Sequence, residues 1–392
     1  MATALRGADF GRRPRARTRR LTRALLASTL ALAVVAGASA TAGAETAPPS
    51  ETAPLDGLAG ATTTFHETLS ARLTPERRAL LEERTAMLSA AGTERIAGKD
   101  RYETAVGVSS VFDPGVPVVY VASGAGFADA LSAAPAAAVQ GGPLLLVQPT
   151  GVPAVVATEL RRLAPQRIVV VGGPGAVSDG VYRQLAGYTN AIRRDAGANR
   201  YATSRLVSER AFAGQAVEVA YVATGTDFPD ALSAGAVAGA YGVPVVLVNG
   251  RATAVDAPTK QLFQALGVGA VGIAGGEGAV SAAVEADLLD EPYLNGNVVR
   301  FAGKNRYETS VALNRDVFEW ANGALLATGA GYADALAGAA AAGYIPVPLW
   351  VVPSTCVPAA VLGDGAALGV STYVLLGGRG VLGDGVASLR QC

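Results

Sequence analysis

Three arginines stand at matching places in the chain, and each is followed by a tyrosine. Arg101, Arg200 and Arg306 lie in the blocks Ala97–Ala105 (AGKDRYETA), Ala196–Ser204 (AGANRYATS) and Ala302–Ser310 (AGKNRYETS). A guanidinium presents a planar fork of donors that matches a phosphate or carboxylate, and its charge does not titrate away. Three such guanidiniums at repeated positions predict binding of a periodic anionic polymer. Because the three sites are linked in one chain, avidity would increase the affinity.

A second repeated motif supplies three aspartates. Asp129, Asp230 and Asp334 lie in the segments Ala122–Leu131 (ASGAGFADAL), Ala223–Leu232 (ATGTDFPDAL) and Ala327–Leu336 (ATGAGYADAL). Each follows a predicted strand, at the edge where open α/β sheets hold their ligands. The favoured interpretation is structural, because an acid at the start of a helix can cap it, a contribution of about 0.5–2 kcal/mol.

The arginines have a structural alternative as well. Each could pair with the aspartate of its own repeat and fasten the start of the repeat to its strand-to-helix turn. Of the 32 basic residues 29 are arginine, so an arginine at any one place is weak evidence for a ligand. Both interpretations are open, and they are compatible.

The tyrosines that follow the arginines also have two interpretations. Tyr102, Tyr201 and Tyr307 could stack on sugar rings. A half-buried tyrosine that contributes its ring to the core is the favoured role, because its polar tip can stay at the surface.

A third repeated motif is rich in glycine. It stands at Val171–Val177 (VGGPGAV), Ala274–Val280 (AGGEGAV) and Leu376–Leu382 (LGGRGVL). The G-x-G-x-x-G spacing of dinucleotide sites and the Walker lysine are both absent. These glycines therefore predict a tight strand-to-helix turn, and we expect no cofactor.

Histidine-dependent chemistry is nearly excluded by composition. The chain has one histidine, His66, which lies in a predicted linker. A Ser-His-Asp hydrolase or a His-ligated zinc amidase needs a histidine inside the folded region. An enzyme that works with paired carboxylates stays open. The obvious acids recur in all three repeats, which favours a binding scaffold, so we expect neither catalysis nor a metal.

The formal charge of zero averages two different segments. Residues 1–44 hold eight arginines and one acid, which leaves 24 basic and 31 acidic residues after Ala44, a formal charge of −7. An acidic body lacks the electrostatic footprint of a nucleic-acid binder. We expect no nucleic-acid partner.

Residues 1–44 have the layout of a secretory signal peptide. A basic block at 12–23 precedes an uncharged stretch that ends in two A-x-A sites, at Ala40 and Ala44. An uncleaved membrane anchor is the alternative, because 21 uncharged residues could just span a bilayer. The stretch is rich in alanine and glycine, so removal is favoured, and we expect a secreted protein with no membrane contact after cleavage.

The two cysteines agree with export. Cys356 and Cys392 are 36 positions apart, and an oxidising compartment permits a disulfide. Two thiols without nearby histidines are an incomplete metal-ligand set. We predict a bridge that stabilises the last part of the chain by about 3–4 kcal/mol.

The motifs recur at domain-sized intervals. The Arg-Tyr pairs are 99 and 106 residues apart, so each copy is long enough to hold a core of its own. In the first copy the pattern alternates between short apolar strands and helices: strand 116–122, helix 129–140, strand 144–147, helix 155–163, strand 167–171 and helix 178–185. Such alternation predicts an α/β fold with parallel sheets covered on both faces.

The remaining segments complete the predicted organisation. Residues 45–73 are rich in proline, threonine and alanine and predict a flexible linker, and 74–93 predict an amphipathic helix. The repeats are then assigned to 94–193, 194–298 and 299–392. We expect three tandem small α/β units.

Together the three motifs resemble the type-2 cell-wall-binding repeat of Gram-positive surface proteins. The resemblance covers residues 94–392 and implies non-covalent attachment to an anionic secondary wall polymer, with the repeats packed as a pseudo-threefold ring and grooves between or beside them. The copies differ: Ala202 replaces Glu103 and Glu308, and the third copy has IPVPLW at 345–350. If binding depends on this face, the three sites need not be equivalent.

These observations predict a secreted, wall-associated binding protein without catalysis of its own. An accessory factor that stimulates a separate wall hydrolase is the alternative, followed by a carboxylate-dependent glycan hydrolase. The expected partners are an anionic wall polysaccharide and possible wall hydrolases.

Overall fold

The computed structural model describes residues 65, 67–71, 79 and 92–392. The predicted signal peptide (1–44), His66 and all but three positions of the predicted amphipathic helix (74–93) lie outside these residues. Three four-stranded sheets form from short strands in which every pairing is parallel. The α/β class and the parallel sheets are confirmed.

Except for two edge strands, GTERI at 92–96 and IRRD at 192–195, the strands are buried runs made largely of valine, leucine, isoleucine and alanine, as expected where helices cover both faces of a sheet. They are β1 (Gly92–Ile96), β2 (Val119–Ser123), β3 (Leu144–Val147), β4 (Ile168–Val171), β5 (Ile192–Asp195), β6 (Val219–Thr224), β7 (Val245–Val248), β8 (Ala270–Ala274), β9 (Val298–Phe301), β10 (Gly323–Thr328), β11 (Leu349–Val352) and β12 (Thr372–Leu376).

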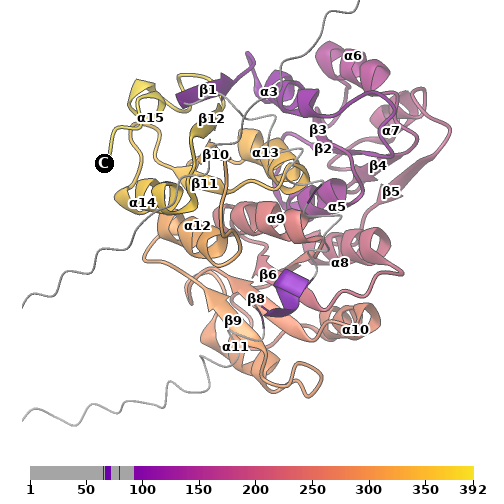
Figure 1. The fold of residues 1–392 in the computed structure, drawn as a ribbon. Helices are drawn as coiled ribbons and strands as arrows, with labels where there is room; N and C mark the ends of the chain where they lie inside the picture. Colours follow the sequence, from indigo (N-terminus) through magenta and orange to yellow (C-terminus); the bar gives the residue numbers. More distant parts are fainter. Residues whose placement is uncertain (1–64, 66, 72–78, 80–91) are drawn as a thin grey trace, which may run out of the picture. The chain divides into compact units, whose positions relative to one another are not determined.

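Helices alternate with these strands (Figure 1). They are α3 (Arg101–Val108), the 3-10 turn Ser109–Val111, α4 (Ala128–Leu131), α5 (Ala133–Val139), α6 (Ala154–Leu163), α7 (Asp179–Leu185), α8 (Arg200–Phe212), α9 (Pro229–Tyr241), α10 (Ala257–Leu266), α11 (Ala282–Leu289), α12 (Arg306–Arg315), α13 (Ala333–Tyr344), α14 (Ala359–Leu368) and α15 (Asp384–Ala387). In the described residues, no helix combines the length and the hydropathy needed to cross a membrane.

One predicted helix is divided in two. The sequence predicts a single helix over 129–140, but α4 ends at Leu131 and α5 begins at Ala133. Pro135 has no N–H and its ring crowds the carbonyl of Leu131, so an unbroken helix is disfavoured there. The other two repeats have alanine at the matching place, and α9 and α13 are continuous.

Each repeat gives its first strand to the sheet of the repeat before it. β5 pairs with β4, and β9 pairs with β8. The first strand of the chain, β1, pairs with β12 of the last repeat, so the exchange of strands closes on itself. The folded units therefore cross the sequence boundaries of the repeats. This cyclic exchange is compatible with the predicted pseudo-threefold ring, whose symmetry stays a prediction.

Three alanine-rich helices, α5, α9 and α13, pack against one another and join the repeats (Figure 1). They meet at Ala138, Gly239 and Gly343, which occupy matching positions in the three repeats. A Cβ added to Gly239 would lie 3.0 Å from the Cα of Gly343 and 2.9 Å from the Cβ of Ala138. The abundance of alanine and glycine thus reflects close packing of backbones as well as helix propensity.

Part of the predicted linker is folded. Residues 65 and 67–71 are helical, and Phe65 and Leu69 are fully buried. The Phe65 ring lies 5.7 Å from the Tyr221 ring and 5.4 Å from the Phe301 ring, measured between centroids. Burying these two large apolar side chains on the sheet of the second repeat stabilises the folded segment, although its surroundings have the composition of a linker. The prediction of a flexible linker is therefore wrong for these residues.

The predicted disulfide is present between Cys356 and Cys392. Backbone hydrogen bonds flank it, because Val357 N–H donates to Arg390 O at 2.8 Å and Cys392 N–H donates to Val357 O at 3.1 Å. The C-terminal end of the chain is therefore fastened to the loop that precedes α14.

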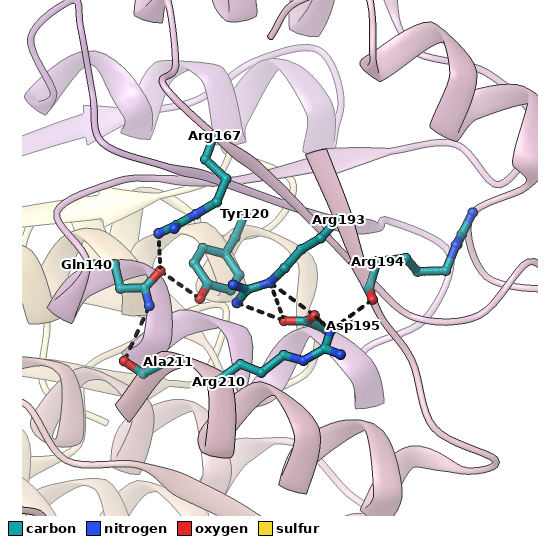
Figure 2. Close-up of polar contacts among 8 residues, drawn as sticks. All are labelled: Tyr120, Gln140, Arg167, Arg193, Arg194, Asp195, Arg210 and Ala211. Carbon is teal, nitrogen blue, oxygen red and sulfur yellow. Dashed lines mark hydrogen bonds and ion pairs between the residues drawn. The ribbon is translucent and has the colours of Figure 1, made fainter. Parts of the chain in front are cut away.

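A buried carboxylate sits where the first two repeats meet (Figure 2). Asp195, at the end of β5, has no exposed surface and accepts hydrogen bonds from Arg193, at 3.1 Å and 3.2 Å, and from Arg210 of α8, at 2.5 Å. Beside it, Gln140 accepts from Tyr120 at 3.1 Å and donates to the carbonyl of Ala211 at 3.3 Å. Polar contacts therefore link α5 of the first repeat to α8 of the second.

Replacing Asp195 with asparagine is expected to destabilise the protein by about 1.5–3 kcal/mol, since its ion pairs with Arg193 and Arg210 lose their anion. The two guanidiniums stay partly solvated, at 28% and 43% exposure, which keeps the loss moderate. Denaturant unfolding measures it, with Asp290→Asn at an exposed position as the control. Equal stability of the two variants would contradict a stabilising role for this pair.

Candidate functional site

Three matching clefts open where the parallel strands end. In the first repeat β2 leads into the turn before α4, and β4 leads into the glycine-rich turn before α7. Because β2 and β4 are parallel neighbours, both turns lie at the same edge of the sheet. The matching turns of the other two sheets are arranged in the same way. Each cleft is named here by the junction of repeats beside which it lies. Residues of more than one repeat line the 1/2 and 3/1 clefts, whereas the residues that line the 2/3 cleft all belong to the second repeat. The 1/2 cleft holds about 660 Å³, and the 2/3 and 3/1 clefts hold about 420 Å³ each. Their charged lining residues are Asp129 and Arg200 (1/2); Asp227, Asp230 and Arg251 (2/3); and Lys99, Asp100, Arg101 and Asp334 (3/1).

The three predicted arginines begin α3, α8 and α12, and side-chain caps fix those helix starts. Asp100, Asn199 and Asn305 accept hydrogen bonds from the first free N–H groups of the helices. Each arginine then reaches the glycine of its own repeat's strand-to-helix turn: Arg200 donates to Gly225 O at 2.5 Å and Arg306 to Gly329 O at 2.6 Å, and Arg101 donates to Gly124 O in the same way. The predicted fastening of each repeat exists, but its acceptor is a backbone carbonyl.

The same arginines lie over aromatic rings of the preceding repeat. The Arg101 guanidinium lies 5.6 Å from the centre of the Tyr332 ring, which belongs to the third repeat. Arg200 over Phe127 and Arg306 over Phe228 show the same arrangement at 5.9 Å each. The three rings are mutual neighbours, with centroids 5.5, 5.7 and 5.8 Å apart. An aromatic cluster thus connects the three arginines.

The predicted aspartates face the next repeat. Burial raises the pKa of Asp129, and Thr203 and Arg200 of the second repeat lower it. Burial likewise raises the pKa of Asp334, opposed by Thr104 and Arg101 of the first repeat. The prediction that each arginine pairs with the aspartate of its own repeat is therefore wrong, because the strand exchange brings a neighbouring repeat's arginine to each acid.

The prediction that these aspartates cap their helices is also wrong. Each lies in the first turn, but α4, α9 and α13 have Phe127, Phe228 and Tyr332 at their N-caps and no side-chain cap. The carboxylates turn instead toward the glycine-rich turn. A Cβ added to Gly172, Gly275 or Gly377 would lie 2.7, 2.4 or 2.5 Å from a carboxylate oxygen. Those glycines have φ of 105–108°, which confirms the predicted tight turn.

Asp230 is the most perturbed of the three acids. Burial first, and the Asp227 carboxylate second, raise its pKa to about 6, and Arg306 opposes both. An acid whose folded pKa lies above its ordinary value makes the folded state less stable as pH rises from about 4 to about 6, and the loss persists above pH 6.

Replacing Asp230 with asparagine is therefore expected to stabilise the protein above pH 6 by roughly 1–3 kcal/mol, and to change little near pH 4. Unfolding free energies measured from pH 4 to pH 8 check this, with Asp290→Asn as the exposed control. A stability difference that does not vary with pH would contradict the ionised, buried state of Asp230.

The tyrosines take their favoured structural role. Tyr102, Tyr201 and Tyr307 are half-buried and pack against the core, and burial raises the pKa of Tyr102. A sugar-stacking role for them stays a prediction. The difference at Ala202 also has a structural explanation. Glu103 and Glu308 accept from the N–H groups of Lys99 and Lys304 at 2.9 and 3.0 Å, so this position supports a helix start.

Sequence reasoning missed three features of the clefts: the aromatic cluster, Asp227 and Arg251. Phe127, Phe228 and Tyr332 belong to the same repeated motif as the three aspartates, and only the aspartates were considered. The repetition of an aromatic residue at this position could have indicated the cluster. Asp227 and Arg251 have no counterpart in the other repeats, so repetition could not reveal them. Among the described residues no group of histidine, cysteine and acidic side chains could hold a metal ion.

Comparisons with known proteins agree with this architecture. Cell wall binding domain 2 (CWB2) matches residues 95–182, 194–285 and 300–387. N-acetylmuramoyl-L-alanine amidase LytC of Bacillus subtilis (strain 168) is 28% identical over 63% of this chain and 47% of its own length. The amidase enhancer of the same organism is 29% identical over 68% of this chain and 36% of its own. The chain thus spans less than half the length of these two relatives.

Two solved structures from Clostridium difficile share the fold. Cwp8 has a TM-score of 0.69 and 25% identity, over 76% of this chain and 51% of that one. Cwp6 has a TM-score of 0.68 and 24% identity, over 76% of this chain and 48% of that one. Three matched repeats that account for most of the chain show that it belongs to the cell wall binding domain 2 family, whose repeats are cell-wall-binding modules.

Proposed function

We propose that the protein is secreted and attaches non-covalently to an anionic secondary polymer of the cell wall through the clefts at the carboxyl ends of its strands. The observation that carries this proposal is the arginine at the same place in all three repeats, held by a carbonyl of its own repeat and an aromatic ring of the preceding one. A guanidinium fixed by one nitrogen keeps other donors for an anionic group.

The separation of the three sites favours a polymeric ligand. A single exposed guanidinium binds a phosphate or carboxylate weakly, and a repeating anion that engages several clefts turns later contacts into intramolecular ones. A wall polymer with regularly spaced anionic groups has this property.

We further propose that the protein has no catalysis of its own. The three repeated aspartates are half-buried against glycine-rich turns and serve the junctions between repeats, so they are poorly placed to act as a pair on a glycan. The similarity to an amidase and to an amidase enhancer makes a wall hydrolase a possible partner, as an accessory role would require.

Co-sedimentation with purified Gram-positive wall tests the attachment. The mature chain, Glu45–Cys392, is mixed with intact wall and with wall from which hydrofluoric acid has removed phosphate-linked polymers. Binding that disappears with the polymer supports the proposal. Binding that survives would replace the polymer with peptidoglycan as the ligand. Reducing ends released by this protein alone, or a changed turnover of an added amidase, would favour the hydrolase or the accessory role instead.

A further inference from the structure

The three clefts differ at one position of the turn before the central helix. The second repeat has Asp227 there, and the other repeats have Gly126 and Gly331. Asp227 therefore brings a carboxylate to the 2/3 cleft at a place where the 1/2 and 3/1 clefts have no side chain at all.

Asp227 is oriented toward Arg306, which lies beside the 2/3 cleft and is not one of its lining residues. One carboxylate oxygen, Oδ1, accepts from the N–H of Phe228 at 2.9 Å, which fixes the side chain. The other, Oδ2, lies 3.6 Å from Nη2 of Arg306. Because Nη1 of Arg306 already donates to Gly329 O at 2.6 Å, the carboxylate faces the edge of the guanidinium that is left for a ligand.

The other two arginines are not engaged in this way. Within residues 92–392 and the described part of the N-terminal segment, neither Arg101 nor Arg200 forms an ion pair with a carboxylate. Arg101 adds a contact to the Tyr332 hydroxyl at 3.2 Å, which is neutral. Asp334 and Asp129 act on these two arginines only at a longer range than an ion pair.

We propose that Asp227 acts as an internal substitute for the ligand's anionic group, so that Arg101 and Arg200 bind the wall polymer and Arg306 contributes little to binding. This inference rests on the proposed function and assigns Asp227 as the residue that makes the clefts unequal. A polymer that reaches Arg306 must displace a carboxylate, a competition that the other two clefts do not impose.

Arg251 restores the charge of the 2/3 cleft without replacing Arg306. It lines that cleft, is exposed, and is matched by threonine in the other repeats, at Thr150 and Thr355. With Arg306 counted beside it, the 2/3 cleft has two acids and two arginines, so its formal charge sums to zero as in the other two clefts. The effect of Asp227 is local to Arg306, and the test must be made on that arginine.

The chain supports a reciprocal pair of variants. Asp227→Gly gives the 2/3 cleft the residue that the other clefts have. Gly126→Asp places the acid in the 1/2 cleft, where a Cβ meets nothing within 4 Å and the backbone is not in the left-handed region. Asp290→Gly, at the exposed C-cap of α11, and Gly363→Asp, at an exposed position of α14, lie away from the clefts and match the changes in net charge.

Wall co-sedimentation and a phosphate titration read out the effect. Exposed ion pairs change binding by up to about fivefold, so Asp227→Gly is expected to tighten wall binding about two- to fivefold and Gly126→Asp to weaken it by a similar factor. Arg306→Ala is expected to cost less than about twofold in the wild type and more than that in the Asp227→Gly background. Inorganic phosphate should shift the arginine side-chain NMR signals of Arg101 and Arg200, and that of Arg306 only after Asp227→Gly.

The outcomes separate this inference from the proposed function. If the wild-type protein does not bind the wall, the proposed function fails. The phosphate titration then still decides whether Asp227 blocks the binding of an anion to Arg306. If the wild type binds the wall and Arg306→Ala costs as much as Arg200→Ala, the clefts are equivalent and the inference fails. Equal phosphate shifts of all three arginines would overturn it in the same way.

Discussion

Replacing Gly239 with valine is expected to destabilise the protein by about 3 kcal/mol or more, the upper range for overpacked cores. A Cβ at this position would lie 3.0 Å from the Cα of Gly343 and 2.9 Å from the Cβ of Ala138. Those neighbours are backbone and a methyl group on α13 and α5, so no side chain can rotate away. The helices α5, α9 and α13 would have to move apart, which would disrupt the packing that joins the three repeats.

The matched control is Gly363→Val on α14. Gly363 is also a helical glycine, but it is exposed and a Cβ there meets nothing within 4 Å. Valine has a somewhat higher helix propensity than glycine, so this change is expected to alter stability by only a few tenths of a kcal/mol, in the stabilising direction. Denaturant unfolding of both variants measures the difference. If the two variants unfold at the same midpoint, the close packing of α5, α9 and α13 does not hold the repeats together.

Replacing both Arg101 and Arg200 with alanine is expected to lower the affinity for cell wall roughly 100-fold, since each loses a charge-assisted contact of about 1.5 kcal/mol or more. The fold should persist, because each arginine contributes one carbonyl hydrogen bond to its own repeat. The lysine variants keep the charge without the planar fork and should recover part of the affinity.

Arg161→Ala with Arg183→Ala is the matched control. Both residues are exposed on α6 and α7, away from the three clefts, and their removal changes the net charge equally. Co-sedimentation isotherms at one salt concentration compare the two double variants. Equal losses would mean that general charge, and not the clefts, carries the binding. Unfolding of the Arg101/Arg200 variant would leave those arginines as structural residues.

Much of the fold follows from local sequence. Short β-branched runs between glycines and alanine-rich segments predict parallel strands and helices, and Leu144–Val147 is a strand with the predicted bounds. Ser178 caps α7 as predicted, with its hydroxyl accepting from the N–H of Val181. These features depend on neighbours within a few positions of the chain.

The connections between repeats could not be predicted from the same patterns. The partner of β1 is β12, and their paired residues Gly92 and Thr372 are 280 positions apart. Once the strands are exchanged, each aspartate meets the arginine of another repeat, which reverses the pairing that proximity in sequence favoured. Motif repetition identified the residues of the clefts, and only the long-range strand pairing determines which of them meet.

The burial of Phe65 shows a second limit. Its surroundings are rich in threonine, alanine and proline, so composition predicts a linker. The ring nevertheless fits between Tyr221 and Phe301, above Gly272, where a Cβ would lie 3.0 Å from it. A single large apolar residue can pack onto a sheet wherever there is a space that fits its side chain. Such a contact produces no periodic pattern in the sequence, so it could not be predicted.

A structure of the mature chain with a released fragment of the wall polymer tests the central claim most directly. The polymer should occupy the 1/2 and 3/1 clefts, with an anionic group within hydrogen-bonding distance of the guanidiniums of Arg200 and Arg101. Polymer bound on the outer helices, or bound in the clefts without contact to either arginine, would contradict anion recognition by the repeated Arg-Tyr motif.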